Sequence, residues 1–505
     1  MFGHGNTGLM WLMSIEHIHL VIYIFCLIAI LVSDKPSSAM VSWIFAITVF
    51  PVIGIVLYLL FGINWRKNRA ISNREKQEGR WFRVRNFLKY DPVDFFLDEK
   101  FLEKSSYRSI DKENISDSEI EIVKLLATAE KTTITRNKSY EIYYSGKEAF
   151  DSIIKDISEA KESILMEYFI WRSDKLGQQI KDLLVKKAKE GVKIRLLFDG
   201  LGSFRAISKK YRRELLKAGI EFRYFLDIKF ALSKLNYRNH RKMTIIDSKI
   251  LHTGGMNLGE EYITGGSRFN EWRDTNFRVE GELVIQYLTI FITDWLNSGG
   301  KNDFETIKLD EIVEKNIVKD DEKYYLMQVS SSGPDTEWTS LKYLYSKLIS
   351  SAKREVLIQS PYFVPDSALV NQLTIMALAG IKIKIIMTGV PDKKIPYWIA
   401  ETYFEELTNA GIEIYRYKAG FLHCKNIVVD GEFSTIGTCN FDMRSLEINY
   451  EINSVFYNRE ISQNVRNQFF KDLEKCEKIE KKQIEKKAFW KRIRNSLFKL
   501  VSPIM

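Results

Sequence analysis

Residues 240–257 read HRKMTIIDSKILHTGGMN, and residues 423–440 read HCKNIVVDGEFSTIGTCN. Both stretches follow one pattern: a histidine, a lysine two positions later, an aspartate five further on, then Gly-Gly or Gly-Thr and an asparagine. The spacing is identical over 18 positions in the two stretches. A pattern of this length that occurs twice is a strong signal, and it indicates that the chain contains two copies of one unit.

The similarity between the copies extends well beyond these stretches. ISEAKESIL at 157–165 returns as ISSAKREVL at 349–357, GVKIR at 191–195 returns as GIKIK at 380–384, and AGIE at 218–221 recurs at 410–413. The offsets are 192, 189 and 192 residues. Each copy alternates helical segments with apolar strands, which predicts an α/β fold of two tandem domains with pseudo-twofold symmetry.

The motif itself predicts a β-hairpin. Positions i and i+2 of a strand share a face, so each histidine and its lysine point the same way. The aspartate ends an apolar run and precedes a turn, which we expect to be a two-residue loop at 431–432 and at 248–249. That register would place Asn440 directly opposite His423 and Asn257 directly opposite His240.

Each copy thus supplies an imidazole, an ammonium group and a carboxamide. This set suits a phosphodiester, because it offers a nucleophile or acid, a point charge and a neutral donor for the non-bridging oxygens. We interpret the two aspartates as turn residues that hold the hairpin. The predicted catalytic motif residues are His240, Lys242, Asp247, His423, Lys425 and Asp430, and the predicted phosphate-binding residues are Asn257 and Asn440.

A catalytic histidine needs a partner on its second ring nitrogen to fix its tautomer. Asp274 and Glu451 stand at matching strand starts in the two copies, so they are the candidates to orient the histidines. Structural ion pairs are the alternative role for these carboxylates. His252 has no counterpart in the second copy, and we interpret it as a core or surface histidine.

The composition fits a globular protein with basic character. Of the 505 residues, 45% are hydrophobic and 28% are charged, which argues against a disordered chain. The net charge of +10 favours polyanions such as nucleic acid or anionic lipid. The four cysteines form no CxxC pair, so we expect buried thiols in a reducing compartment, with no metal site and no cofactor.

The first 65 residues differ from the rest and predict a transmembrane helical hairpin. Two apolar runs, 18–33 and 39–63, flank a short polar break, and the second run is long enough for one bilayer crossing. The segment 66–89 is rich in lysine and arginine, which the positive-inside rule places in the cytoplasm. A buried hairpin in a soluble protein is the alternative.

The remaining boundaries follow from composition and from the repeats. We expect a basic juxtamembrane segment and connector at 66–138, domain 1 at 139–300, a charged linker at 301–322, and domain 2 at 323–485. Residues 486–505 combine basic side chains with apolar ones at helical spacing. This tail is predicted to be an amphipathic helix on an anionic membrane, or else a helix packed on the protein's own surface.

The doubled HxKxxxxD motif resembles the phospholipase D superfamily, and WRDT at 272–275, SGPD at 332–335 and PYFVPD at 361–366 resemble bacterial cardiolipin synthases. The resemblance implies a phosphatidyltransferase of the bacterial cytoplasmic membrane, multi-pass, with cytoplasmic catalytic domains. Two phosphatidylglycerols would give cardiolipin and glycerol through a phosphohistidine, with His240 attacking and His423 as acid and base. The usual family turn is Gly-Ser-x-Asn, so a hydroxyl that could contact phosphate is missing at Gly255.

Three other functions are alternatives for this chain. A phospholipase D that hydrolyses lipid headgroups shares the motif, because acceptor choice depends on pocket shape and water exclusion. A nuclease is disfavoured, since nucleic acid requires no membrane hairpin, and a non-catalytic lipid binder is disfavoured by two intact motifs. The residues alone leave open which histidine attacks, acyl preference, phosphatidylethanolamine as donor, and oligomeric state.

Overall fold

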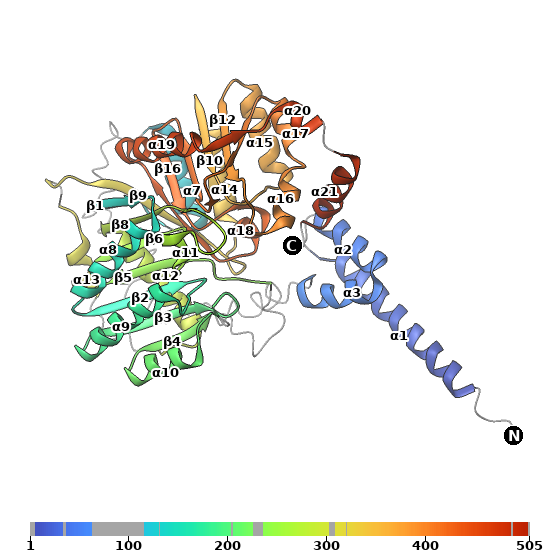
Figure 1. The fold of residues 1–505 in the computed structure, drawn as a ribbon, viewed down its shortest axis with the longest axis horizontal. Coiled ribbons are helices and arrows are strands. Elements are labelled where there is room, and N and C mark those ends of the chain that lie inside the picture. Colours follow the sequence, from blue (N-terminus) through green and yellow to red (C-terminus); the bar gives the residue numbers. More distant parts are fainter. Residues whose placement is uncertain are drawn as a thin grey trace.

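The computed structural model describes residues 6–33, 37–62, 116–130, 132–203, 206–225, 236–301, 309–319, 321–485 and 488–502 (Figure 1). Two α/β halves lie side by side, and the N-terminal helices project from them next to the C-terminal helix (Figure 1). The basic segment 66–89, the polar break at 34–36 and two tail lysines at 486–487 fall outside the described residues.

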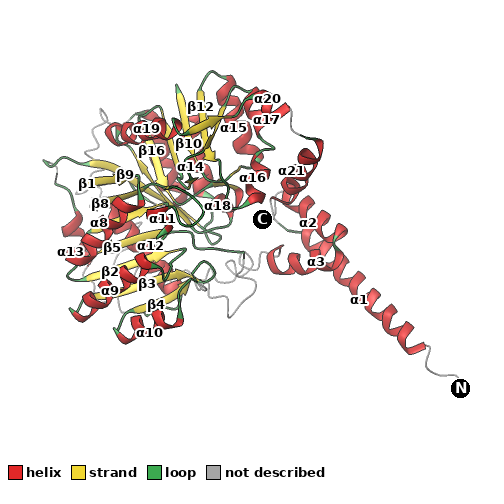
Figure 2. Ribbon diagram, viewed as in Figure 1, coloured by secondary structure: helices red, strands yellow, loops and turns green. Residues whose placement is uncertain are grey.

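A single 15-stranded sheet runs through both halves (Figure 2). Copy 1 contributes seven strands in the order β4-β3-β2-β5-β6-β8-β1, and copy 2 repeats this order as β13-β12-β10-β15-β16-β18-β9, with β19 at the edge. β1 pairs antiparallel with β9 and joins the copies. The bounds are β1 (Thr135–Tyr143), β2 (Ser163–Tyr168), β3 (Lys193–Asp199), β4 (Glu221–Phe225), β5 (Lys242–Ile246), β6 (Ile250–Gly254), β8 (Asn276–Gly281), β9 (Tyr325–Ser332), β10 (Glu355–Gln359), β12 (Lys382–Thr388), β13 (Glu413–Tyr417), β15 (Asn426–Val429), β16 (Phe433–Gly437), β18 (Glu451–Phe456) and β19 (Cys476–Lys478).

The predicted two tandem α/β domains are therefore confirmed. In each copy, parallel strands such as β2 and β3 are joined through a helix, and the next two strands form the antiparallel motif hairpin. Short parallel pairs, β7 (Trp272–Arg273) with β14 (Phe421–Leu422) and β11 (Phe363–Val364) with β17 (Phe441–Asp442), complete the set. The pair of β7 and β14 is formed between the two copies, close to the motif of copy 2.

Helices cover the sheet and form its cores. The long helices α12 (Leu283–Asn297) and α19 (Arg459–Leu473) contribute to one shared core with strands of both copies. Cores specific to one copy lie under the helices of that copy. The other helices are α8 (Gly146–Glu159), α9 (Lys175–Lys189), α10 (Lys209–Lys217), α11 (Glu261–Thr264), α14 (Ser340–Ser350), α15 (Ser367–Leu378), α16 (Lys394–Ala400), α17 (Phe404–Asn409), α18 (Met443–Glu447), α20 (Lys481–Glu485) and α21 (Phe489–Val501).

Parts of the expected connector and linker are ordered. α7 (Asp117–Glu130) packs Ile122 and Leu126 into the core of copy 2, and β1 begins at Thr135 within the same segment. In the linker, α13 (Leu309–Asn316) places Ile312 in the shared core. These segments read as polar overall, but a few apolar residues at helical spacing suffice to fix a helix against a preformed core.

The N-terminal region forms α1 (Asn6–Leu31), α2 (Ser37–Val49), α3 (Pro51–Leu57) and a π-helical turn, η1 (Tyr58–Gly62). The second apolar run is broken at Phe50, because Pro51 lacks an N–H and its ring excludes a continuous helix. α3 folds back so closely that a Cβ on Gly54 would lie 2.3 Å from the Ala46 carbonyl oxygen. Within the described ranges, no helix combines the length and apolarity that a membrane crossing requires. The transmembrane hairpin stays a prediction.

The register of the motif hairpins differs from the expected one by one residue. Val429 pairs with Phe433 and Ile246 with Ile250, so each loop has three residues. The backbone is left-handed at Asp430 and Gly431, and at Asp247 and Ser248. The prediction that each asparagine faces its histidine in the ladder was wrong, because a loop longer by one residue shifts every cross-strand pair.

Candidate active site

His240 lies just before β5, where the other copy holds its backbone and its ring. Its N–H donates to the Tyr450 carbonyl oxygen over 2.8 Å. Its Nδ1 lies 2.9 Å from Glu451 Oε2 and 3.1 Å from the Thr438 carbonyl oxygen. The partners of its N–H and of its Nδ1 thus all come from copy 2.

His423 shows the reciprocal arrangement. Its N–H donates to the Arg273 carbonyl oxygen over 2.7 Å, and its Nδ1 lies 2.6 Å from Asp274 Oδ2. Both predicted orienting carboxylates therefore contact a histidine, and each contacts the histidine of the opposite copy. This crossing brings the two motifs into one site at the domain interface.

The two lysines are buried beside the histidines. Each ammonium group donates to the carbonyl oxygen of its own copy's histidine, and Lys425 Nζ also lies 3.9 Å from Asp274 Oδ2. Burial lowers the pKa of Lys242 to about 7, and the charge of Lys425 adds to that effect. Burial likewise lowers the pKa of Lys425. Two buried cations so close together favour the binding of an anion.

Both imidazoles are held in the neutral form. Burial lowers the pKa of His240 to about 4, and the attraction of Glu451 offsets only part of this effect. Burial and the charge of Lys425 lower the pKa of His423 to about 3. In the described part of the chain, neither Nε2 takes part in a hydrogen bond. A neutral ring with Nδ1–H fixed on a carboxylate presents a lone pair at Nε2.

The orienting carboxylates remain ionised. Burial alone would raise the pKa of Asp274, but Lys425 and His423 together outweigh burial and lower it. Burial acts in the same way on Glu451, whose pKa is nevertheless lowered by His240 and Lys242. Each anion can therefore stabilise an imidazolium when its histidine takes up a proton.

The motif aspartates lie in the turns, away from the imidazoles. The Asp247 carboxylate accepts three backbone N–H groups that precede and begin β2, from Lys161, Glu162 and Ser163. Asp430 repeats this arrangement with the N–H groups of residues 353–355, which precede and begin β10. These contacts fix the hairpin to the adjacent strand, which agrees with their interpretation as turn residues.

The two asparagines are anchored by other protein groups. Asn257 accepts the Ile170 N–H over 3.1 Å and donates to the Tyr262 hydroxyl over 3.0 Å. Asn440 donates to Ser445 Oγ over 3.3 Å, whereas its buried Oδ1 has no partner in the described residues. Each amide keeps a free hydrogen-bonding position, so phosphate binding by these residues stays a prediction.

Sequence reasoning missed the aromatic wall around His423. The Tyr262 hydroxyl lies 3.4 Å from His423 Nδ1, and the rings of Trp272 and Phe421 lie 6.0 and 5.7 Å from the imidazole. His240 contacts the Phe169 ring at 5.1 Å. No signal in the motif points to these residues, because they reach the site from α11 and from strands that pair only in the folded chain.

The Gly-Gly and Gly-Thr turns have a structural explanation. The Thr438 hydroxyl donates to Glu451 Oε2 over 2.6 Å, which supports the carboxylate behind His240. At the equivalent Gly255, a Cβ would lie 2.2 Å from Asp274 Oδ1, so the shorter carboxylate occupies the space of the missing side chain. In this chain, the hydroxyl at that position serves the orienting carboxylate.

Two buried ion pairs tie the site to the long helices. Arg241, next to His240, binds Asp294 of α12, and Arg273, next to Asp274, binds Asp472 of α19. His252 is fully buried and lies 2.7 Å from Asp156 Oδ2, so of the two roles considered it has that of a core histidine. All four cysteines are free thiols, and Cys26, Cys424 and Cys439 are buried. Across the described ranges, no cluster of His, Cys, Asp and Glu is arranged to hold a metal ion.

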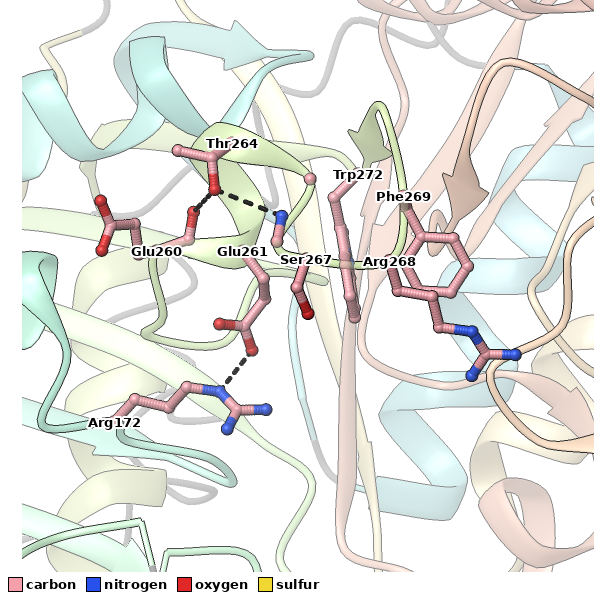
Figure 3. Close-up of a pocket in the computed structure, with 10 residues that line it drawn as sticks. Arg172, Glu260, Glu261, Thr264, Ser267, Arg268, Phe269 and Trp272 are labelled. Atoms are coloured by element: carbon pink, nitrogen blue, oxygen red, sulfur yellow. Dashed lines mark hydrogen bonds and ion pairs between the residues drawn. The ribbon is translucent and has the colours of Figure 1, made fainter.

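A cavity of about 370 Å³ opens beside the His423 half of the site (Figure 3). It is lined by α11, by the residues that follow α11 up to Trp272, and by Arg172. Trp272 belongs both to this cavity and to the aromatic wall around His423.

The family model described as "Cardiolipin synthase, PLD-like domain" matches residues 153–295 and 345–473, one match in each copy. The chain belongs to this cardiolipin synthase family. The model "Phospholipase_D-nuclease N-terminal" matches residues 21–62. The resemblance that the motifs indicate is thereby confirmed over most of the chain.

Relatives in the cardiolipin synthase family align over most of their length. The chain is 37% identical to a cardiolipin synthase of Clostridium perfringens over 469 residues, which cover 92% of this chain and 94% of that protein. It is 34% identical to cardiolipin synthase 2 of Bacillus anthracis over 478 residues, with 94% and 88% covered. The crystal structure of a phosphatidylserine synthase from Haemophilus influenzae shares the fold, with a TM-score of 0.56 at 16% identity over 76% of this chain and 100% of that one.

Proposed function

We propose that the protein is a cardiolipin synthase that transfers a phosphatidyl group from one phosphatidylglycerol to another. The crossed histidine–carboxylate pairs carry this proposal, because they unite two neutral imidazoles and two buried lysines in one site. That constellation suits covalent transfer of a phosphodiester. Membership of the cardiolipin synthase family supports phosphatidylglycerol as the substrate.

In the first half of the proposed reaction, His240 Nε2 attacks the phosphorus of the first phosphatidylglycerol. A P–N bond forms, the P–O bond to the headgroup glycerol breaks, and the departing oxygen takes a proton from His423. His423 must be protonated for this step. The bound anionic diester and the ionised Asp274 both favour the imidazolium, which opposes the effect of burial on the pKa of this histidine.

In the second half, a headgroup hydroxyl of another phosphatidylglycerol gives its proton to His423 and attacks the phosphohistidine. The new P–O bond completes cardiolipin, the P–N bond breaks, and His240 returns to its neutral state. Lys242 and Lys425 neutralise charge on the non-bridging oxygens in both transition states. Asn257 and Asn440 add neutral hydrogen bonds in this proposal. No step requires a metal ion or an organic cofactor.

We further propose that residues 1–65 embed the protein in the bacterial cytoplasmic membrane as a multi-pass anchor. Large apolar side chains are exposed along α1 to α3, among them Val21, Phe25, Val52 and Ile53. A continuous exposed apolar surface of this kind marks a partner or a lipid phase in most proteins. The basic segment 66–89 supports a cytoplasmic position for the catalytic domains. Phosphatidylglycerol and anionic membrane lipids are the expected partners, and no nucleic acid is expected.

The C-terminal helix α21 connects this anchor to domain 2. On one face, the Phe498 ring lies 5.5 Å from that of Trp398 in α16, and Asn495 donates to Glu401 over 2.9 Å. The Ser42 hydroxyl of α2 donates to the Leu500 carbonyl oxygen. On the opposite face, Phe489 and Trp490 are 68% and 76% exposed. We propose that this second face rests on the anionic membrane. The helix would then pack on the protein with one face and contact the membrane with the other.

The test is a lipid product analysis of the purified full-length chain in mixed micelles with phosphatidylglycerol. Equal amounts of cardiolipin and glycerol are expected, with an acid-labile phosphoenzyme as the intermediate. Replacing either histidine of the motif by alanine should abolish turnover. Phosphatidic acid as the main lipid product would instead identify a hydrolase, and substantial activity in either alanine variant would refute the single site.

A further inference from the structure

The cavity beside His423 is built from side chains that can bind hydroxyl groups. Figure 3 shows Arg172, Glu261 and Ser267 reaching into the same space next to the edge of the Trp272 ring. Arg172 Nε donates to Glu261 Oε1 over 2.6 Å, which fixes a carboxylate and a guanidinium side by side. Glu261 is largely buried by this arrangement, whereas Arg172 remains half exposed.

The charge of the cavity favours a neutral ligand. Its charged lining consists of two arginines and two glutamates, Arg172, Arg268, Glu260 and Glu261, so that the formal charges cancel. Threonine and serine hydroxyls complete the polar lining, and a few aromatic carbons form one wall. An acyl chain would displace water from these polar groups without replacing its hydrogen bonds, and an anionic headgroup would find no net positive charge. A small polyol satisfies both conditions.

Two residues connect the cavity to the reacting histidine. Glu261 precedes Tyr262, whose hydroxyl lies 3.4 Å from His423 Nδ1. Trp272 lines the cavity and lies 6.0 Å, ring to ring, from the same imidazole. Its buried indole N–H donates to no acceptor among the described residues. An unsatisfied donor of this kind can donate a hydrogen bond to a ligand oxygen that reaches it.

The rim of the cavity is fixed to the second domain. The Arg268 guanidinium donates to the carbonyl oxygens of Pro391 and Asp392 over 2.7 and 3.2 Å. The Tyr362 hydroxyl in turn donates to Asp392 Oδ2 over 2.7 Å. The lining residues thus belong to copy 1, and copy 2 holds the cavity in place through Arg268.

We propose that this cavity is the subsite for the glycerol headgroup, and that it serves both half-reactions. The proposal rests on the proposed transfer between phosphatidylglycerols. The glycerol that departs with a proton from His423 leaves through the cavity, and the headgroup of the second phosphatidylglycerol then enters the cavity. Free glycerol and the acceptor lipid therefore compete for one place on the phosphohistidine enzyme. When glycerol wins, its hydroxyl gives a proton to His423, the P–N bond breaks, and phosphatidylglycerol is reformed.

This return reaction gives a direct assay. Full-length enzyme in phosphatidylglycerol micelles is supplied with ¹³C-glycerol, and the label that enters phosphatidylglycerol is measured against glycerol concentration. Glu261→Gln should raise the half-saturating glycerol concentration about 10-fold, because a charged acceptor for a hydroxyl is lost. Ser267→Ala changes an exposed side chain and should raise it about 3-fold without affecting folding. Glu159→Gln, an exposed surface change on α8, is the matched control and should leave it unchanged.

The outcomes separate this proposal from the proposed function. If the half-saturating glycerol concentration stays within about 2-fold of the wild-type value in both cavity variants, the cavity is not the headgroup subsite, even while cardiolipin is still formed. If the wild-type enzyme forms neither cardiolipin nor labelled phosphatidylglycerol, the proposed function itself fails. Cardiolipin formation, followed in the same samples, verifies that each variant retains a working nucleophile.

Discussion

The most informative single perturbation is Asp274→Asn, which keeps the shape of the side chain and removes its charge. Asp274 Oδ2 lies 2.6 Å from His423 Nδ1, and Oδ1 accepts the Thr275 N–H over 2.8 Å. In the variant, the amide oxygen is needed for the Thr275 N–H, so the NH₂ group faces the imidazole. His423 must then accept at Nδ1 and carry its proton on Nε2, the wrong tautomer for a base.

Two further losses follow from the same change. The ionised Asp274 raises the pKa of His423, so without this charge the imidazolium forms less readily. Asp274 Oδ2 also lies 3.9 Å from Lys425 Nζ, so the variant removes a negative charge that balances the lysine ammonium group. An amide behind a catalytic imidazole costs about 10⁴-fold in kcat in the serine proteases. We expect a loss of about 10³- to 10⁴-fold here, which corresponds to roughly 4–5.5 kcal/mol of transition-state stabilisation.

The assay is the initial rate of cardiolipin formation in detergent micelles, together with a thermal melt of each variant. Asp156→Asn is the matched control, since Asp156 holds the buried His252 over 2.7 Å in the core, away from the reacting groups. The control should lower the melting temperature and leave the rate of the folded enzyme nearly intact. An Asp274→Asn enzyme that melts like the wild type and keeps more than about a tenth of its rate would refute the proposed role of this carboxylate.

Three other outcomes are expected. The value of kcat should fall as the pH rises, because the departing glycerol needs the proton of the His423 imidazolium and because the Lys242 ammonium, whose pKa is lowered to about 7, loses its charge. The bound anionic lipid and Asp274 favour the His423 imidazolium and move this limb towards higher pH. A flat profile up to pH 9 would contradict both assignments. Removal of residues 1–64 should leave a folded domain that is active on lipid in micelles and has little activity on lipid in bilayers. A truncated protein that is insoluble in detergent would count against independent folding. In a protein that lacks the anchor, Trp490→Asp should weaken binding to phosphatidylglycerol vesicles more than binding to neutral vesicles. High salt should also weaken binding to phosphatidylglycerol vesicles, because it screens surface charge. If the variant binds both kinds of vesicle as the unchanged protein does, α21 serves internal packing alone.

The repeat and the motif spacing were sufficient to predict the two tandem α/β domains and the polar residues that the candidate site brings together. The two copies preserve the order of apolar strands and the 18-residue motif, and both are local patterns that can be read along the chain. His252 was correctly separated from the reacting histidines because it lacks a counterpart. The motif aspartates were correctly interpreted as turn residues, since an apolar strand ends at each of them.

Three features were misjudged or missed because they depend on geometry that spacing does not fix. The hairpin loops hold three residues instead of two, since the turn at Asp430 and Gly431 adopts left-handed backbone before the strand resumes. The second apolar run bends at Pro51, although its composition reads as continuous. The aromatic wall of Tyr262 and Trp272 comes from segments about 150 residues from His423 in sequence.

The sequence by itself determined that this chain has two equivalent α/β domains, and it singled out the histidines, lysines and carboxylates of the candidate site. Only the tertiary structure decided how they are paired: Asp274 of copy 1 holds His423 of copy 2, and Glu451 of copy 2 holds His240 of copy 1. The physical reason is that periodicity constrains neighbours along one strand, whereas these pairs join residues 149 and 211 positions apart. These contacts cross the interface of the two copies, which β1 and β9 join into one sheet.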